Sequence, residues 1–142
     1  MKSNDPDDPA NPVASKRILV IDDDEMLRAM LVQTLERAGY EVIEAPNGDA
    51  GIKLFRAQPA DLVITDLIMP EKEGVETMLE LRRDYPALPI IAVSGGARAA
   101  GRDYLPIARQ LGVRCALAKP FSRQEILEAI RGAFMPGREA DI

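Results

Sequence analysis

Short apolar segments alternate with longer amphipathic stretches along most of the chain. The apolar segments are rich in Ile, Leu and Val, which is typical of strands buried on both faces of a parallel sheet. We expect strands at Ile18–Ile21, Glu41–Glu44, Leu62–Thr65, Ile90–Val93 and Cys115–Ala118. The alternation of strand and helix predicts repeated βα units, and therefore an α/β fold in which helices cover a parallel sheet.

Two helices are expected before the third strand. The first spans Met26–Arg37 and stops at Gly39, a residue type that commonly ends helices. The second is expected to begin after Asn47, whose side chain can cap the first free backbone N–H groups, and to run to about Gln58. Both stretches carry apolar residues at helical spacing, so each is expected to bury one side.

Two further helices are expected in the second half of the chain. One follows Gly74 and ends before Pro86, and the last begins after Ser122, with Glu125 at the capping-box position. The residues expected to face inward are Met26, Leu27, Met30, Leu31, Thr34 and Leu35 in the first helix, Val75, Met78, Leu79 and Leu81 in the third, and Ile126, Leu127, Ile130 and Phe134 in the last.

The remaining segments are less regular. Gly95–Gly112 contains several glycines, so its helix is expected to be short and to start late, near Pro106. Residues 1–15 are polar and proline-rich and predict a disordered tail. We expect one domain at 16–135 and a C-terminal tail at 136–142, with too few residues after Phe134 for a second domain.

Composition narrows the class of protein. The 142 residues are 46% hydrophobic and 29% charged, with a net charge of −5, as expected for a globular protein with no affinity for nucleic acid. The apolar runs are far shorter than the roughly 20 residues that cross a bilayer, so no membrane association is expected. The N-terminus lacks the apolar core of a secretion signal, which favours a cytoplasmic location.

The chain contains no histidine and one cysteine, Cys115, which is interpreted as a small core residue. Imidazole catalysis and the usual zinc ligands are therefore excluded. Any chemistry must depend on carboxylates, hydroxyl groups and lysines.

Polar residues follow four of the predicted strands. They are Asp22, Asp23, Asp66, Ser94 and Lys119, the last of which is followed by Pro120. Ligands of open parallel sheets bind at the carboxyl ends of the strands, so these side chains are expected to converge. Crowded carboxylates favour a cation, and Mg²⁺ suits oxygen ligands. Each residue alone also fits a solvated turn, a helix cap such as Asp24, or a surface lysine.

Four stretches of the chain carry a recognisable pattern in their order and spacing: ILVIDDDEMLR, DLVITDLIMP followed by Gly74, IIAVSGG and LAKPF. Together they resemble the receiver domain of two-component response regulators, of the stand-alone single-domain type. The resemblance covers roughly Arg17–Phe134. It implies a flavodoxin-like doubly wound fold, with five parallel strands in the order 2-1-3-4-5.

The resemblance also implies a role for each site residue. Asp66 would be the phosphoacceptor, and Mg²⁺ would be held by Asp23, Asp66 and the backbone carbonyl of Ile68, with Asp22 supporting it through water. Ser94 and Lys119 would stabilise the phosphoryl group, and Lys119–Pro120 would be a cis peptide bond.

The function implied is that of a phosphoacceptor rather than an enzyme, apart from self-catalysed transfer and autodephosphorylation. Because the chain has no histidine, a separate histidine kinase or histidine phosphotransfer protein would supply the phosphoryl group, and an unknown protein target would receive the signal. Ala116 stands where many receivers carry an aromatic switch residue, and Gly95–Gly101 is longer than usual. As a hypothesis, phosphorylation reorders Gly95–Leu105 and moves Tyr104.

Four alternatives remain open. The chain could be a phosphorylation-independent binding module or a phosphoryl sink. A phosphatase of the haloacid dehalogenase type is disfavoured because Ile68 stands where those enzymes have a second acid. A flavodoxin is disfavoured because acids, rather than a Ser/Thr/Gly-rich phosphate loop, follow the first strand.

Overall fold

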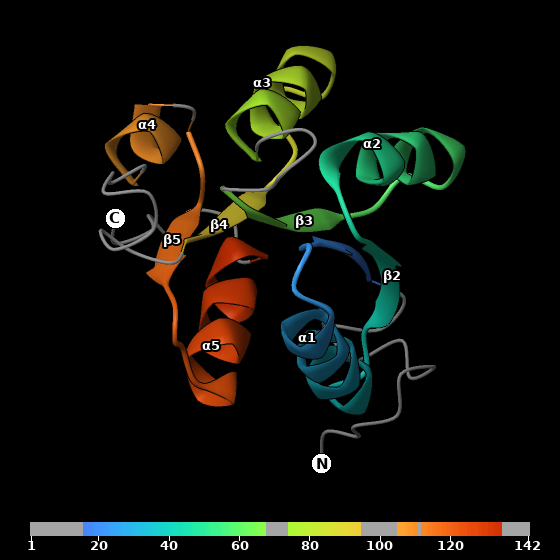
Figure 1. The fold of residues 1–142 in the computed structure, drawn as a ribbon, viewed down its shortest axis with the longest axis vertical. Coiled ribbons are helices and arrows are strands. Elements are labelled where there is room, and N and C mark those ends of the chain that lie inside the picture. Colours follow the sequence, from blue (N-terminus) through green and yellow to red (C-terminus); the bar gives the residue numbers. More distant parts are fainter. Residues whose placement is uncertain (1–15, 68–73, 95–104, 111, 135–142) are drawn as a thin grey trace.

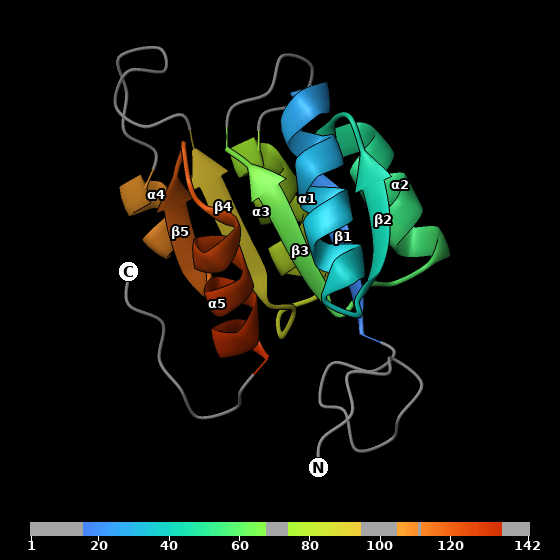
Figure 2. The same cartoon turned by 90° about the horizontal axis from the view of Figure 1, so that it is seen from below.

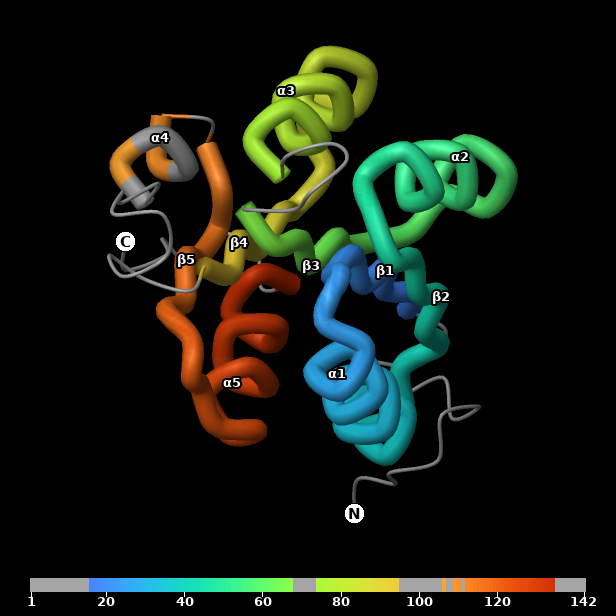
Figure 3. The backbone as a smooth tube through the Cα atoms, viewed as in Figure 1, coloured from blue at the N-terminus to red at the C-terminus, as the bar shows by residue number. Residues whose placement is uncertain are grey.

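Five parallel strands form one sheet at the centre of the protein. The computed structural model describes residues 16–67, 74–94, 105–110 and 112–134. The strands are β1 (Arg17–Ile21), β2 (Glu41–Ala45), β3 (Leu62–Asp66), β4 (Ile90–Ser94) and β5 (Cys115–Ala118). They lie in the order β2-β1-β3-β4-β5 (Figure 3). The expected doubly wound flavodoxin-like fold is confirmed, with the strand order reversing between β1 and β3.

Helices cover both faces of the sheet. The helices α1 (Glu25–Arg37) and α5 (Arg123–Ala133) lie on one face, and α2 (Gly48–Ala57), α3 (Gly74–Asp84) and α4 (Leu105–Gln110) lie on the other (Figure 1). Successive strand residues point to opposite faces, so Leu19 and Ile21 pack in one core while Ile18 and Val20 pack in the other. This double burial explains why β1 is apolar at consecutive positions.

Local capping chemistry sets the starts of three helices as expected. Asp24 Oδ1 accepts hydrogen bonds from the backbone N–H groups of Met26 and Leu27 at the start of α1. Asn47 caps α2 in the same way, and Ser122 forms a reciprocal capping box with Glu125 at the start of α5. The observed strands extend the expected ones by at most one residue, and α4 is short and begins at Leu105.

Two residues expected to face inward are exposed. Met26 is 85% exposed because it lies in the first turn of α1, which projects past the carboxyl edge of the sheet (Figure 2). Leu79 is 51% exposed, because the buried stripe of α3 runs through Thr77, Met78 and Leu81 and turns Leu79 towards solvent. The expectation was wrong at both positions, although the helices themselves were placed correctly.

Several expectations concern residues outside the described part of the chain. These are the tails at 1–15 and 136–142, the Gly95–Gly101 segment, Tyr104 and Ile68. In the described ranges, none of the helices combines the length and apolar character needed to span a bilayer.

The capping box of α5 provides a test of the local interactions. Ser122→Ala removes the side-chain oxygen that accepts from the Glu125 N–H, and is expected to lower the free energy of unfolding by about 1 kcal/mol in urea denaturation. Gln124→Ala, in the same exposed turn, is the control and should change it by less than about 0.5 kcal/mol. Equal effects of the two substitutions would contradict the assignment of the cap.

Candidate functional site

The register of the sheet aligns the carboxyl ends of its strands. Asp66 at the end of β3 lies opposite Val93, and Ser94 at the end of β4 lies opposite Ala118. Pairing continues one residue further, where the Lys119 N–H donates to the Ser94 carbonyl at 2.6 Å. The polar residues that follow separate strands are therefore brought to one edge of the sheet.

Three carboxylates meet at this edge. One carboxylate oxygen from each of Asp22, Asp23 and Asp66 lies within 4.8 Å of the others. Asp22 is fully buried and Asp66 is 4% exposed, whereas Asp23 is open to solvent. The cluster is therefore anchored in the sheet on one side and accessible on the other. The expected convergence of these three acids is observed.

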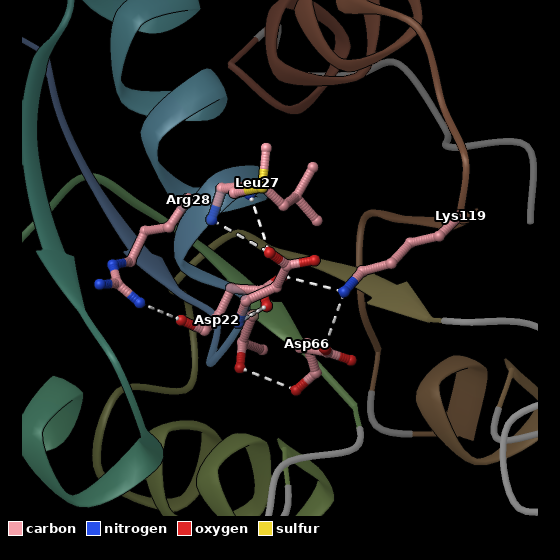
Figure 4. A network of polar contacts seen from close by, with 8 residues as sticks. Asp22, Leu27, Arg28, Asp66 and Lys119 are labelled. Atoms are coloured by element: carbon pink, nitrogen blue, oxygen red, sulfur yellow. Dashed lines mark hydrogen bonds and ion pairs between the residues drawn. The ribbon is translucent and has the colours of Figure 1, made fainter.

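Lys119 supplies the positive charge among these acids. Its ammonium nitrogen lies 2.9 Å from Asp66 Oδ2, to which it donates a hydrogen bond, and 3.1 Å from Asp22 Oδ2 (Figure 4). The Lys119 side chain is 21% exposed, so this charge is partly shielded from water. One ammonium group thus partly balances two carboxylates that are nearly inaccessible to solvent.

Burial and charge shift two pKa values at the site. Burial raises the pKa of Asp22, and the nearby Asp66 charge adds to this, although the Asp24 N–H and Lys119 act against them. Burial acts to lower the pKa of Lys119, but the hydrogen bond and charge of Asp66, with the charge of Asp22, outweigh it and raise that pKa. Lys119 is therefore charged in this environment.

The turn that carries Asp22 and Asp23 is held by hydrogen bonds. Asp22 Oδ1 accepts from the Asp24 N–H at 2.8 Å, and Asp24 in turn caps α1. The Asp22 N–H donates to the Ala45 carbonyl at the end of β2, at 3.2 Å. The remaining carboxylate oxygen, Asp22 Oδ2, is buried and accepts no hydrogen bond from the described residues, and its contact is the ion pair with Lys119 at 3.1 Å. That oxygen therefore already faces a positive charge, as a ligand of a cation would.

Gly74 at the start of α3 allows close approach to the backbone of Asp66. A Cβ atom on Gly74 would lie only 1.6 Å from the Asp66 carbonyl oxygen. The Gly74 N–H also donates to the Leu67 carbonyl at 3.0 Å, which ties α3 to the end of β3. Glycine is required here by the space available rather than by a positive φ.

The other predicted residues are placed as follows. Ser94 is fully buried at the end of β4. The Lys119–Pro120 peptide bond is cis, as expected. Ala116 is half-buried in β5 and packs against the core beneath α2 and α3. Ile68, expected to offer a backbone carbonyl to the metal, lies outside the described residues.

Sequence reasoning missed the contacts of Arg28. This arginine on α1 donates to the Asp22 backbone carbonyl at 2.7 Å and pairs with Glu44 of β2 at 2.9 Å. The two partners are six and sixteen residues away along the chain, so no local spacing rule connects them. The single available signal was an arginine three residues after a run of four consecutive acids, Asp22 to Glu25.

The donor set is compatible with Mg²⁺. An octahedral ion with ligands at 2.0–2.1 Å places neighbouring ligand atoms about 3 Å apart and opposite ones about 4 Å apart. The three carboxylate oxygens lie within 4.8 Å of one another, which small side-chain movements would bring into this range. The buried Asp22 Oδ2, which accepts no hydrogen bond from the described residues and is paired with the Lys119 ammonium, also suits a cation. A hard ion with oxygen ligands is therefore favoured over zinc.

The fold and site define a doubly wound α/β protein that gathers three acids and one lysine at the carboxyl edge of its sheet. The chain belongs to the response regulator receiver domain family, whose profile matches residues 18–131. It is therefore a receiver domain of two-component signalling.

Comparisons with individual proteins agree with this membership. The chain is 33% identical to the Thermotoga maritima chemotaxis protein CheY, across 81% of this chain and 94% of CheY. It is 33% identical to the Bacillus subtilis regulatory protein PhoP, across 79% of this chain, but spans only 45% of PhoP. It superposes on the Thermotoga maritima response regulator TrrA, solved in complex with Mg²⁺-BeF, with a TM-score of 0.73 and 31% identity, covering 83% and 98% of the two chains.

The close approach at Gly74 generates a prediction. Gly74→Ala is expected to displace the Asp66 carbonyl and to lower the free energy of unfolding by about 2 kcal/mol or more, as measured by urea denaturation. Gly132→Ala is the matched control, because a Cβ atom there meets nothing within 4 Å and alanine should stabilise helix α5 by up to about 1 kcal/mol. Similar effects in the two variants would refute the steric role of Gly74.

Proposed function

We propose that this receiver domain accepts a phosphoryl group on Asp66 from a phosphohistidine of another protein, with Mg²⁺ held by Asp22, Asp23 and Asp66. One observation carries the proposal: the Asp66 carboxylate lies beside two further acids and is hydrogen-bonded to Lys119 at 2.9 Å. Such an arrangement combines a nucleophile, ligands for a hard cation and a positive charge for the incoming phosphoryl oxygens.

The proposed transfer is a displacement at phosphorus. A carboxylate oxygen of Asp66 attacks the phosphorus atom as the bond from phosphorus to the histidine nitrogen breaks, and that nitrogen keeps the electron pair. The product is an acyl phosphate on Asp66. Water later cleaves it, which restores the carboxylate and releases inorganic phosphate. The donor must be another protein, because this chain has no histidine.

The residues around Asp66 have distinct electrostatic roles. The Lys119 ammonium, now shared between Asp66 and Asp22, would pair with an oxygen of the transferred group. Asp22 and Asp23 would hold Mg²⁺, which when bound neutralises negative charge on the carboxylates and the phosphoryl oxygens. Support for the metal comes from TrrA, whose complex contains Mg²⁺ with a beryllofluoride group, a mimic of a phosphoryl group. Ser94 would donate its hydroxyl hydrogen to the phosphoryl group.

The output of the domain is proposed to be contact with another protein. The related proteins carry names from chemotaxis and from transcriptional regulation, so family membership is compatible with different outputs. We expect the target to be selected by the surface of this chain rather than by its acidic site.

Asp66→Asn tests the phosphoacceptor. Incubation of the wild-type protein with Mg²⁺ and either acetyl phosphate or phosphoramidate should add one phosphoryl group, detected by intact mass, and Asp66→Asn should abolish the adduct because the amide is a poor nucleophile. Asp61→Asn is the control, since Asp61 lies at the opposite end of β3 and is exposed. No adduct on the wild-type protein with either donor would favour a phosphorylation-independent binding module instead.

Lys119→Met tests the proposed electrostatic role of the lysine. Removing this ammonium is expected to slow phosphorylation by about 100-fold, while Mg²⁺ binding should not weaken because a competing positive charge has left the carboxylates. Rates would be followed by intact mass, and Mg²⁺ binding by amide chemical shifts. Lys53→Met on the exposed surface of α2 should leave both unchanged. An unchanged rate in Lys119→Met would exclude this role.

A further inference from the structure

Arg28 contacts the acidic turn from the side opposite Lys119 (Figure 4). It extends from the first turns of α1, and its side chain is 15% exposed. Its Nη1 atom donates to the Asp22 backbone carbonyl at 2.7 Å, and its Nε atom pairs with Glu44 Oε1 at 2.9 Å. A single side chain thus connects α1, the end of β1 and the end of β2.

The contact completes the restraint of Asp22. The N–H of this residue is bonded to the Ala45 carbonyl, its Oδ1 atom to the Asp24 N–H, and its carbonyl to Arg28. With these three groups engaged, Oδ2 is left within reach of Asp66 and Lys119. A bond from a charged guanidinium is stronger than one between neutral groups, so the contribution of Arg28 to this restraint is substantial.

The ion pair with Glu44 explains how the positive charge of Arg28 is tolerated near the three carboxylates. An uncompensated guanidinium beside Asp22 would repel a divalent ion and weaken its binding. The ion pair with Glu44, whose side chain is 50% exposed, makes the Arg28–Glu44 pair neutral as a unit. The pair can therefore hold the backbone of Asp22 without adding net positive charge to the site.

We propose that Arg28 is a positioning residue for the cation site, and that Glu44 both orients it and cancels its charge. This inference rests on the proposed function for its cation, Mg²⁺. Arg28 touches neither the metal nor the phosphoryl group. It acts through the peptide group between Asp22 and Asp23, whose carbonyl oxygen accepts its hydrogen bond. Holding this peptide group also orients the backbone of Asp23. Residues that orient metal ligands in this way commonly contribute tenfold or more to metal affinity.

The test compares Mg²⁺ binding in four variants, Arg28→Met, Arg28→Lys, Glu44→Gln and Arg28→Met with Glu44→Gln. Mg²⁺ is titrated into ¹⁵N-labelled protein without any phosphoryl donor, and the amide shifts give the dissociation constant. The initial phosphorylation rate with phosphoramidate is then measured as a function of Mg²⁺ concentration. Arg56→Met is the matched control, because it removes an exposed arginine with two carboxylate partners, Glu80 and Asp84, on helices that cover the other face of the sheet.

We expect Arg28→Met to raise the Mg²⁺ dissociation constant by about tenfold. The Mg²⁺ concentration that gives half of the maximal phosphorylation rate should rise by the same factor. The rate at saturating Mg²⁺ should stay within about twofold of wild type, because Arg28 does not touch the reacting atoms. Arg28→Lys keeps a hydrogen-bond donor and a positive charge but lacks the planar guanidinium that contacts the Asp22 carbonyl and Glu44 at once. Its Mg²⁺ dissociation constant should therefore lie between those of wild type and Arg28→Met. Glu44→Gln should weaken Mg²⁺ binding by only about two- to threefold, an effect that salt reduces. Arg56→Met should match wild type.

The double variant, Arg28→Met with Glu44→Gln, separates the loss of the hydrogen bond to Asp22 from the change in local net charge. It restores local neutrality without restoring the bond to Asp22, so its Mg²⁺ affinity should remain as low as that of Arg28→Met. Wild-type affinity in the double variant, or in Arg28→Met itself, would overturn the positioning role while leaving the proposed function intact. A wild-type protein that binds no Mg²⁺ would overturn both. Thermal unfolding of every variant distinguishes a local change at the site from a general loss of structure.

Discussion

The repulsion among three carboxylates at one edge of the sheet is the constraint on which the rest of the site depends. Their oxygens lie within 4.8 Å of one another, and two of the acids are nearly inaccessible to water. Positive charge within a few ångströms offsets this repulsion. Lys119 provides it by contacting Asp22 and Asp66 together, so the position of β5, which carries this lysine to the edge, matters as much as the position of the acids.

The sheet meets this constraint because its register fixes the spacing of Asp66 and Lys119, while a hydrogen-bonded turn after β1 holds Asp22 and Asp23 beside them. Asp66 ends β3 in register with β4, and the backbone of Lys119 is bonded to that of Ser94. The absence of a side chain at Gly74 lets α3 begin against the Asp66 carbonyl. Apolar burial on both faces makes this framework rigid, so the free energy of core packing is what holds like charges close together.

Much of this architecture could be predicted because it depends on local patterns. Short β-branched runs gave the strands, and the side-chain caps Asp24, Asn47 and Ser122 gave the helix starts. Met26 was placed wrongly because helical periodicity does not indicate where the sheet beneath a helix ends, and Leu79 because the buried stripe of α3 includes the polar Thr77 instead. The strand-end rule located the acids and Lys119, whereas the contact from Arg28 to Asp22 and the close approach of Gly74 to Asp66 depend on how a helix packs back against the end of the preceding strand.

Ala116 limits how a change at Asp66 can reach the surface. It lies in the middle of β5 opposite Ala92, and Ala118 lies opposite Ser94, so the strand beside the site presents small side chains. Ala116 has no aromatic ring whose rotation could follow a movement of the Ser94 hydroxyl. The backbone bond between Lys119 and Ser94 nevertheless joins the two residues proposed to contact the phosphoryl group. A shift of Lys119 away from Asp22 would therefore act on the ends of β4 and β5 together, through the main chain rather than through a side-chain rotation.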